Sequence, residues 1–296
     1  MHNSKFSGLG VAMVTPFLAD GKIDFKGLEK LTNHLITGGV NYLVVQGTTG
    51  ENVTLSESEK TEVITFVLEV NKGRVPVVLG VGGNNTAEIV AKLSKGLPSG
   101  VDGILSVSPY YNKPTQEGIY QHFKAVLQAT DLPVILYNVP GRTGSNMLVS
   151  TTLRIANDFK NALAIKEASG NVEQIMQLIK DKPVGFDIIS GDDGITLPLM
   201  AAGAVGVISV IGNALPVQFS ALVNACSTGD FAKARKLHYQ LYNVYGALFE
   251  EGNPGGVKEI LKHLNIIDNH MRLPLVPVSE NHSKKLYKLL AENGLN

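Results

Sequence analysis

The sequence predicts a (β/α)₈ barrel followed by a helical extension. Short apolar runs recur eight times along the chain, a stretch of helical periodicity separates each run from the next, and only helical patterns continue after residue 229. Such a barrel uses about 250 residues around one core, so a chain of 296 residues has room for a barrel and an appendage. We expect the barrel over residues 1–229 and the helical extension over residues 230–296.

The eight expected strands are nearly continuous apolar runs. They do not alternate between apolar and polar residues, which is typical of parallel strands buried on both faces. In chain order they cover residues 9–14, 42–45, 77–80, 104–107, 134–137, 163–166, 186–190 and 206–210.

Helix-start signals separate these runs. The clearest is a capping box, in which Ser56 and Glu59 precede apolar residues at helical spacing. Similar patterns begin at Asp24, Thr115, Asn171 and Pro216. Beyond the barrel, helices are expected over 232–251, 257–264 and 280–293, joined by segments rich in proline and glycine.

An open, doubly wound sheet is the alternative arrangement of parallel βα units. Its first strand would normally lead into a glycine-rich turn that binds phosphate. Here Thr15-Pro16-Phe17 follows the first strand. Together with the count of eight strands, this favours the closed barrel.

Composition limits the classes of partner. Lys and Arg number 26, as do Asp and Glu, so the formal net charge is zero and no global field attracts a nucleic acid. No apolar run approaches the roughly 20 residues that span a bilayer, and the polar start of the chain lacks a signal peptide's apolar core. The single cysteine, Cys226, cannot form an internal disulfide. We expect a cytoplasmic protein with no nucleic-acid or membrane partner.

Functional residues are expected at the C-terminal ends of the strands, where barrel active sites lie. Lys166 ends the sixth predicted strand and should point into the barrel mouth. Burial penalises the charged form of an amine, which is one way that enzymes make lysine nucleophilic. The alternative is a structural lysine paired with Glu167 or Asp192, and position alone does not decide between the two.

Side chains with hydroxyl groups lie at or just after the ends of three predicted strands. Tyr137 ends the fifth strand, and Thr48 and Tyr111 follow the second and fourth. A chain of hydroxyls is a plausible proton path near a nucleophilic amine. For one of Tyr110 and Tyr111, the alternative is packing at a helix or subunit surface.

Two short segments could hold carboxylates. Gly47-Thr48-Thr49-Gly50 offers backbone N–H groups and two hydroxyls beside a helix start. Gly141-Arg142-Thr143-Gly144 places a guanidinium just past the fifth strand, where it could clamp a second carboxylate. The alternative for Arg142 is a surface arginine in a glycine turn.

A divalent metal is the competing way to polarise a carbonyl, and it usually requires histidines or several carboxylates facing one point. Asp192 and Asp193 are a possible pair, but adjacent side chains point in different directions, which favours loop or capping roles. A phosphorylated substrate stays open, since glycine-rich turns after late barrel strands can bind phosphate. None of the histidines ends a predicted strand; they are His2, His34, His122, His238, His263, His270 and His282.

Four motifs at the strand ends resemble one family. They are Gly47-Thr48-Thr49-Gly50-Glu51, Tyr137-Asn138-Val139-Pro140, Ile165-Lys166-Glu167-Ala168 and Ser190-Gly191-Asp192-Asp193. Across nearly the whole chain the sequence resembles the dihydrodipicolinate synthase / N-acetylneuraminate lyase family of Schiff-base barrels. Pro109-Tyr110-Tyr111-Asn112-Lys113-Pro114 and the segment around Arg142 favour the synthase subgroup over the lyases, which recognise a sugar acid.

This resemblance implies a condensation through Lys166. Pyruvate would form a Schiff base with the amine, and the derived enamine would attack L-aspartate 4-semialdehyde to give 4-hydroxy-tetrahydrodipicolinate, a step of diaminopimelate and lysine biosynthesis. No metal or organic cofactor is implied. The alternatives are a class I aldolase or lyase for a sugar-derived 2-keto acid such as N-acetylneuraminate, and a non-catalytic barrel.

The resemblance also implies roles for individual residues. Arg142 would hold the carboxylate of the aldehyde substrate, and Thr49 that of pyruvate. The proton relay would consist of Thr48, Tyr111 and Tyr137, and backbone groups of Gly191 and Ile208 would line the site. Tyr111 would come from a neighbouring subunit, in a homotetramer built as a dimer of dimers.

A lysine feedback pocket is only partly matched. Asn84, Glu88 and Tyr110 fit the family's pattern, but Glu57 and Lys60 stand where lysine-sensitive members often have histidines. A cation at Lys60 would repel the ammonium of an incoming lysine. We therefore expect weak or absent feedback.

Overall fold

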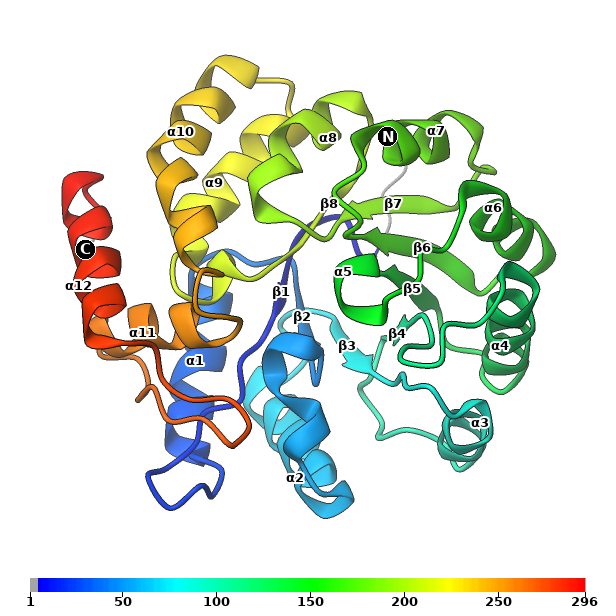
Figure 1. Cartoon of the computed structure of the whole chain (residues 1–296), viewed down its shortest axis with the longest axis horizontal. Coiled ribbons are helices and arrows are strands. Elements are labelled where there is room, and N and C mark those ends of the chain that lie inside the picture. The colour runs from blue at the N-terminus through cyan, green and yellow to red at the C-terminus, as the bar shows by residue number, and fades with distance from the viewer. Residues whose placement is uncertain (1–4, 296) are drawn as a thin grey trace.

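The computed structural model describes residues 5–295, and its eight parallel strands close into one barrel (Figure 1). Strands are paired in chain order, and the first pairs with the eighth through Leu9 opposite Val207. The predicted fold is confirmed, and the open-sheet alternative is wrong. The strands are β1 Gly8–Ala12, β2 Tyr42–Val45, β3 Val77–Gly80, β4 Gly103–Val107, β5 Val134–Asn138, β6 Ala162–Glu167, β7 Asp187–Ser190 and β8 Gly206–Ser209.

The predicted strand ends differ from the observed ones by at most two residues. The largest difference is in the first strand, which was expected to continue to Val14 but ends at Ala12. Beyond that point the N–H of Val14 donates to the side-chain oxygen of Asn213 at 3.1 Å instead of joining the ladder. A residue 199 positions away therefore ends the strand, which local periodicity could not indicate.

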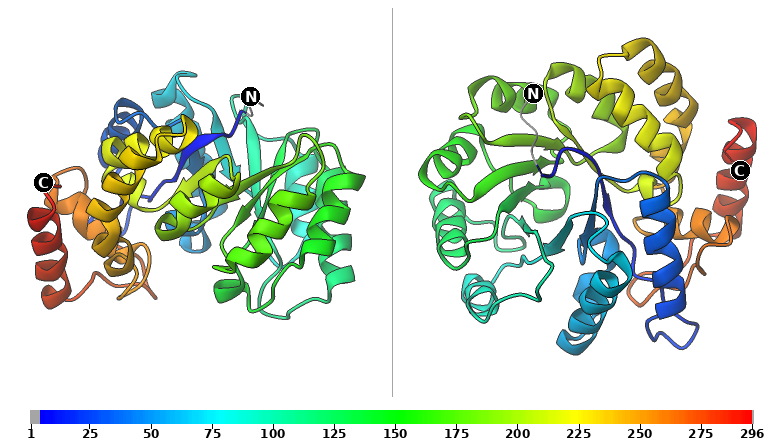
Figure 2. Two further views of the ribbon diagram at one scale, coloured as in Figure 1. Left: turned by 90° about the horizontal axis from the view of Figure 1, so that it is seen from above. Right: turned by 180° about the vertical axis from the view of Figure 1, so that it is seen from behind.

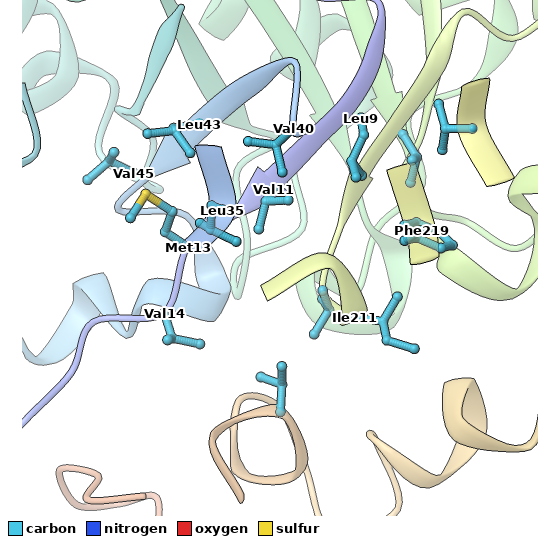
Figure 3. Packing of buried hydrophobic residues seen from close by; sticks show 14 of the residues in the cluster. Leu9, Val11, Met13, Val14, Leu35, Val40, Leu43, Val45, Ile211 and Phe219 are labelled. Carbon is cyan, nitrogen blue, oxygen red and sulfur yellow. The ribbon is translucent and has the colours of Figure 1, made fainter. Parts of the chain in front are cut away.

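Each strand separates two apolar regions. The inner side chains fill the barrel, whereas the outer ones pack against the surrounding helices. Figure 3 shows Leu9, Val11 and Met13 in this outer region, together with Leu35 and Phe219 from helices. The inner region includes Ala12, Tyr42, Val44, Val78, Leu105, Ile135, Tyr137, Ala164, Ile189 and Ile208.

The helices that carry capping signals begin where the sequence predicts. Asp24, Thr115 and Asn171 each accept a hydrogen bond from the first turn, and the capping box at Ser56 is present with both of its bonds. These helices and α9 are α1 Phe25–Thr37, α2 Glu57–Asn71, α4 Gln116–Gln128, α7 Val172–Asp181 and α9 Pro216–Ser227.

Four other helices have no start predicted above. The residue before each of them makes no side-chain capping bond. They are α3 Thr86–Ser94, α5 Pro140–Thr143, α6 Val149–Asp158 and α8 Thr196–Ala202.

The C-terminal extension consists of α10 Phe231–Ala247, α11 Gly255–His263 and α12 Glu280–Glu292. Figures 1 and 2 show it at one side of the barrel. Helix α10 packs on α9 and α8, and its buried Leu241 and Val244 join the apolar region outside the barrel. The division into residues 1–229 and 230–296 stays a prediction. Within residues 5–295, no helix has both the length and the apolar character needed to cross a membrane.

Candidate active site

Lys166 and Tyr137 lie side by side at the open end of the barrel. They are partners in the register of β5 and β6, and both side chains are on the inner face. The amine nitrogen Nζ of Lys166 lies 4.3 Å from the centre of the Tyr137 ring. Lys166 is 5% exposed and Tyr137 is 6% exposed. The amine is therefore nearly removed from solvent, as the sequence predicts.

The two acids proposed as structural partners of Lys166 are occupied elsewhere. Glu167 lies on the opposite face of β6, where its carboxylate accepts hydrogen bonds from Asn138 at 3.0 Å and Gln174 at 3.1 Å. The Asp192 carboxylate accepts one from the N–H of Gly194 at 2.8 Å. Among residues 5–295, Lys166 forms no ion pair. The interpretation of Lys166 as half of a structural pair is therefore wrong.

A cavity of about 1000 Å³ opens above the lysine. A second cavity of about 240 Å³ shares part of this wall and extends toward Tyr110. The two cavities together could hold a keto acid at the amine and a second substrate beside it. Six of the predicted site residues line the larger cavity; they are Thr48, Thr49, Tyr137, Arg142, Lys166 and Gly191.

The two threonines lie in a tight turn after β2, within the 3₁₀ helix η1 Thr48–Gly50. Thr48 is exposed and Thr49 is buried. The hydroxyl oxygen of Thr49 accepts a hydrogen bond from the side-chain amide of Asn253 at 3.0 Å. Glu51 ends the turn with a φ of 53°, in the left-handed region. This turn is thus held at Thr49 and at its end.

Arg142 lies in the short helix α5, directly beyond the end of β5. Its side chain lines both cavities. It forms no ion pair with any residue from 5 to 295. A guanidinium without a carboxylate partner, facing a cavity, is suited to bind an anion.

Gly191 and Ile208 occupy different depths. Gly191 lines the cavity, and a Cβ atom there would lie 2.6 Å from the Cβ of Ala168, so no larger residue fits without movement. Ile208 is on the inner face of β8 and is 1% exposed. Its side chain belongs to the packed interior, so its predicted contribution depends on its backbone groups and stays a prediction.

Tyr111 is not brought to Lys166 within this chain. It lies in the loop after β4 with a φ of 76°, and it is 87% exposed. Neither of the two cavities at the barrel mouth includes it. Tyr110 lines the smaller cavity instead. Its predicted part in the proton relay, and its predicted origin in a neighbouring subunit, stay predictions.

Of the two adjacent aspartates, Asp192 caps a helix and Asp193 joins two loops, the kinds of role that the sequence favours. Asp192 caps the 3₁₀ helix η3 Asp193–Ile195, and Asp193 accepts hydrogen bonds from the N–H groups of Val210 at 3.0 Å and Ile211 at 2.8 Å. Burial raises the pKa of Asp193 to about 6, although these hydrogen bonds act in the opposite direction. They hold the loop after β7 against the loop after β8.

Metal-ligand groupings are absent from the described part of the chain. Within residues 5–295, no cluster of three or more His, Cys, Asp and Glu side chains could hold a metal ion. His2 lies outside the described residues. The expectation that the reaction requires no metal stays a prediction.

The model of the Dihydrodipicolinate synthetase family matches residues 5–293. The chain belongs to this family. It is 51% identical to the 4-hydroxy-tetrahydrodipicolinate synthase of Parabacteroides distasonis over 292 residues, covering 99% of this chain and 98% of that one. It is 55% identical to the synthase of the same name from Flavobacterium psychrophilum over 281 residues, covering 95% and 96%.

Solved structures of dihydrodipicolinate synthases have the same fold. That of Thermotoga maritima has a TM-score of 0.96 at 42% identity, covering 99% of this chain and 100% of the other. That of Acinetobacter baumannii, solved as a complex with pyruvate, has a TM-score of 0.95 at 41% identity, covering 98% and 99%. The family, the fold and the synthase activity predicted from the sequence are confirmed.

Sequence reasoning missed the part that the extension plays in the site. Tyr245 of α10 and Asn253 both line the large cavity of this synthase-family barrel. Asn253 was interpreted only as part of a linker. Its spacing from other site residues carries no signal, because its partner Thr49 is 204 positions away.

The extension also places a charged side chain in a buried position beside the turn after β2. Lys258 of α11 is fully buried, and its Nζ lies 2.5 Å from an oxygen of Glu51, which is also buried. Burial lowers the pKa of Lys258, and the carboxylate of Glu51 opposes this effect. A signal was present, since Lys258 stands three residues before Leu261 on the apolar face of its helix.

Proposed function

We propose that the chain condenses pyruvate with L-aspartate 4-semialdehyde to give 4-hydroxy-tetrahydrodipicolinate in lysine biosynthesis. The observation that carries this proposal is the amine of Lys166, which is buried, has no acidic partner and faces a cavity beside Tyr137. Support comes from the synthase relatives and from a family structure solved with pyruvate.

The first half of the reaction uses Lys166 as the nucleophile. Its neutral amine attacks the keto carbon of pyruvate, and loss of water from the carbinolamine gives an iminium ion. The nearby hydroxyl of Tyr137 supplies and accepts the protons of these steps. Lysine suits this role because its amine can lose its proton when buried, whereas the guanidinium of arginine stays charged.

The second half forms the carbon–carbon bond. Loss of a methyl proton from the iminium ion gives an enamine, whose terminal carbon attacks the aldehyde carbon of the second substrate. The amino group of that substrate then attacks the imine carbon and displaces Lys166, closing the ring. One water is released overall, and the enzyme's amine is restored without any change of oxidation state.

The two substrates would be bound by different groups: one by a hydrogen-bonding turn, the other by a cationic side chain. The turn at Thr48 and Thr49 is placed to receive the carboxylate of pyruvate near Lys166. Arg142, which lines both cavities and has no acidic partner, would hold the carboxylate of the aldehyde substrate.

The proton relay includes Tyr111 of a neighbouring subunit, within a homotetramer. Its support is the large exposed fraction of this tyrosine, which lines neither cavity at the mouth of its own barrel.

Trapping tests the nucleophile and the first substrate together. Reduction with borohydride in the presence of pyruvate is expected to leave one covalent adduct per chain, and peptide mass spectrometry is expected to locate it on Lys166. EDTA is expected to leave turnover unchanged. An adduct on another lysine, or no adduct, would overturn the proposed chemistry.

We expect lysine to inhibit this enzyme weakly or not at all. Asn84, Glu88 and Tyr110 line a separate cavity of about 750 Å³, and so does Lys60. Lys60 and a second lysine share the single carboxylate of Glu57, at 2.6 and 3.2 Å. The wall thus carries three lysines against two glutamates and repels a fourth ammonium group.

Steady-state assays with added lysine measure this effect. Sub-millimolar lysine is expected to leave more than half of the activity. The variant Lys60→Ala, which removes one of these cations, is expected to be inhibited more strongly. Half-inhibition of the unaltered enzyme in the sub-millimolar range would contradict the prediction.

A further inference from the structure

The buried carboxylate of Glu51 joins the threonine turn to two segments of the extension. One oxygen lies 2.5 Å from Nζ of Lys258, and the other accepts a hydrogen bond from the N–H of Arg272 at 3.4 Å. The same Nζ donates to the carbonyl of His270 at 2.9 Å. Every one of these partners is more than 200 positions from Glu51 in the chain, so the contact depends wholly on how the extension docks.

The ion pair of Glu51 and Lys258 is also closed to solvent. Nζ of Lys258 lies 4.5 Å from the centre of the Phe17 ring, and the Arg272 guanidinium lies 4.6 Å from the same ring. Arg272 in turn binds both oxygens of Glu59 in α2. Neither Glu51 nor Lys258 lines the cavity at the barrel mouth. This ion pair therefore cannot touch a substrate there, and any effect on the reaction must act through other residues.

The residue through which it can act is Thr49, two positions before Glu51. The amide nitrogen of Asn253 donates to the Thr49 hydroxyl oxygen at 3.0 Å, and Asn253 is five residues before Lys258. Since the oxygen already accepts this hydrogen bond, the hydroxyl's own proton is directed elsewhere. Thr49 lines the cavity, so its hydroxyl is available as a donor to a group bound there.

We propose that the buried pair of Lys258 and Glu51 positions the threonine turn for binding of the substrate carboxylate. The pair holds the turn against the extension, and Asn253 then orients the Thr49 hydroxyl as a donor to the carboxylate. These are positioning residues. The proposal rests on the proposed function, in which Thr49 receives the carboxylate of pyruvate.

A hydrogen bond to a bound carboxylate contributes in the ground state and in the transition state alike. Its loss therefore raises the KM for pyruvate and changes kcat little. Removing only one charge would leave its partner buried and unpaired, which endangers folding, whereas replacing both by neutral side chains of similar size is tolerated more often. The double variant Glu51→Gln, Lys258→Met is thus the suitable test.

For this double variant we expect a KM for pyruvate raised about tenfold, with kcat and the KM for the aldehyde changed less than about threefold. The matched control is Leu286→Ala, which removes a fully buried side chain of α12 away from the turn. It should lower the thermal midpoint without raising the KM for pyruvate. A double variant that folds and keeps the original KM overturns the proposal, as does a control with the same rise in KM.

Variants at Asn253 keep the test decisive if the double variant does not fold. Asn253→Ala removes the donor to Thr49 and should raise the KM for pyruvate. Asn253→Asp should raise it further, because a carboxylate there would accept the Thr49 proton and repel the substrate. An unchanged KM in both overturns the proposal. Failure of the unaltered enzyme to form a pyruvate adduct would instead refute the proposed function, so the two failures are distinguishable.

Discussion

Lys166→Ala is expected to lower turnover by at least about 10⁴-fold while the barrel stays folded. The amine is the covalent nucleophile, and no other residue can form the iminium ion at the same place. The fold should persist because the lost group is a buried cation without an acidic partner, and the space that it leaves opens into a cavity. Steady-state assays and borohydride trapping measure the loss, and thermal unfolding measures the fold.

Lys285→Ala provides the matched control. Lys285 is the other lysine in the cavity wall, but its amine is engaged by Glu250 at 2.6 and 2.8 Å. Its removal should leave trapping and turnover near those of the unaltered enzyme. If Lys166→Ala retained substantial activity, or still formed an adduct with pyruvate, the assignment of the nucleophile would be wrong.

Arg142→Met is expected to lower kcat/KM for the aldehyde substrate by about 10³-fold. The guanidinium is the cationic group without an acidic partner that lines both cavities of the mouth, and a planar fork can bind a carboxylate through two parallel hydrogen bonds. Pyruvate binds at Lys166 through other residues, so adduct formation should continue at nearly the original rate. Kinetics with each substrate varied in turn separate the two effects.

Arg142→Lys distinguishes charge from geometry. A lysine keeps the positive charge but loses the paired donors, so we expect an intermediate loss for the aldehyde substrate. If Arg142→Met slowed adduct formation with pyruvate as much as it slowed the complete reaction, the arginine would belong to the pyruvate site. The assignment to the second carboxylate would then be wrong.

The sequence located the reactive group with simple arguments. Alternation along β6 places Lys166 on the same face as Ala164, and Glu167 on the other, so the strand's end determines which side chain faces the mouth. Helices with a side-chain cap, such as α2 behind Ser56, began at the predicted residue. Helix α6 has no such cap, and no start was predicted for it.

The sequence predicted a feature less completely where that feature depends on a contact with a residue far away in the chain. The first strand ends early because the side-chain oxygen of Asn213 accepts a hydrogen bond from the N–H of Val14. Whether Lys166 is paired could not be decided from position, and it was settled by the hydrogen bonds that occupy Glu167. The structure of one chain does not show where the Tyr111 side chain acts, because its ring is exposed and lines neither cavity at the barrel mouth.

Periodicity and capping act over a few residues, so the amino-acid pattern was enough to predict the order of strands and helices and the face on which the reactive lysine lies. The part that the extension takes in the site follows only from contacts in three dimensions. Glu51 meets Lys258 across 207 positions, and Asn253 meets Thr49 across 204. Such contacts form only when α11 docks on the barrel, and no local pattern encodes the distance or direction of that docking.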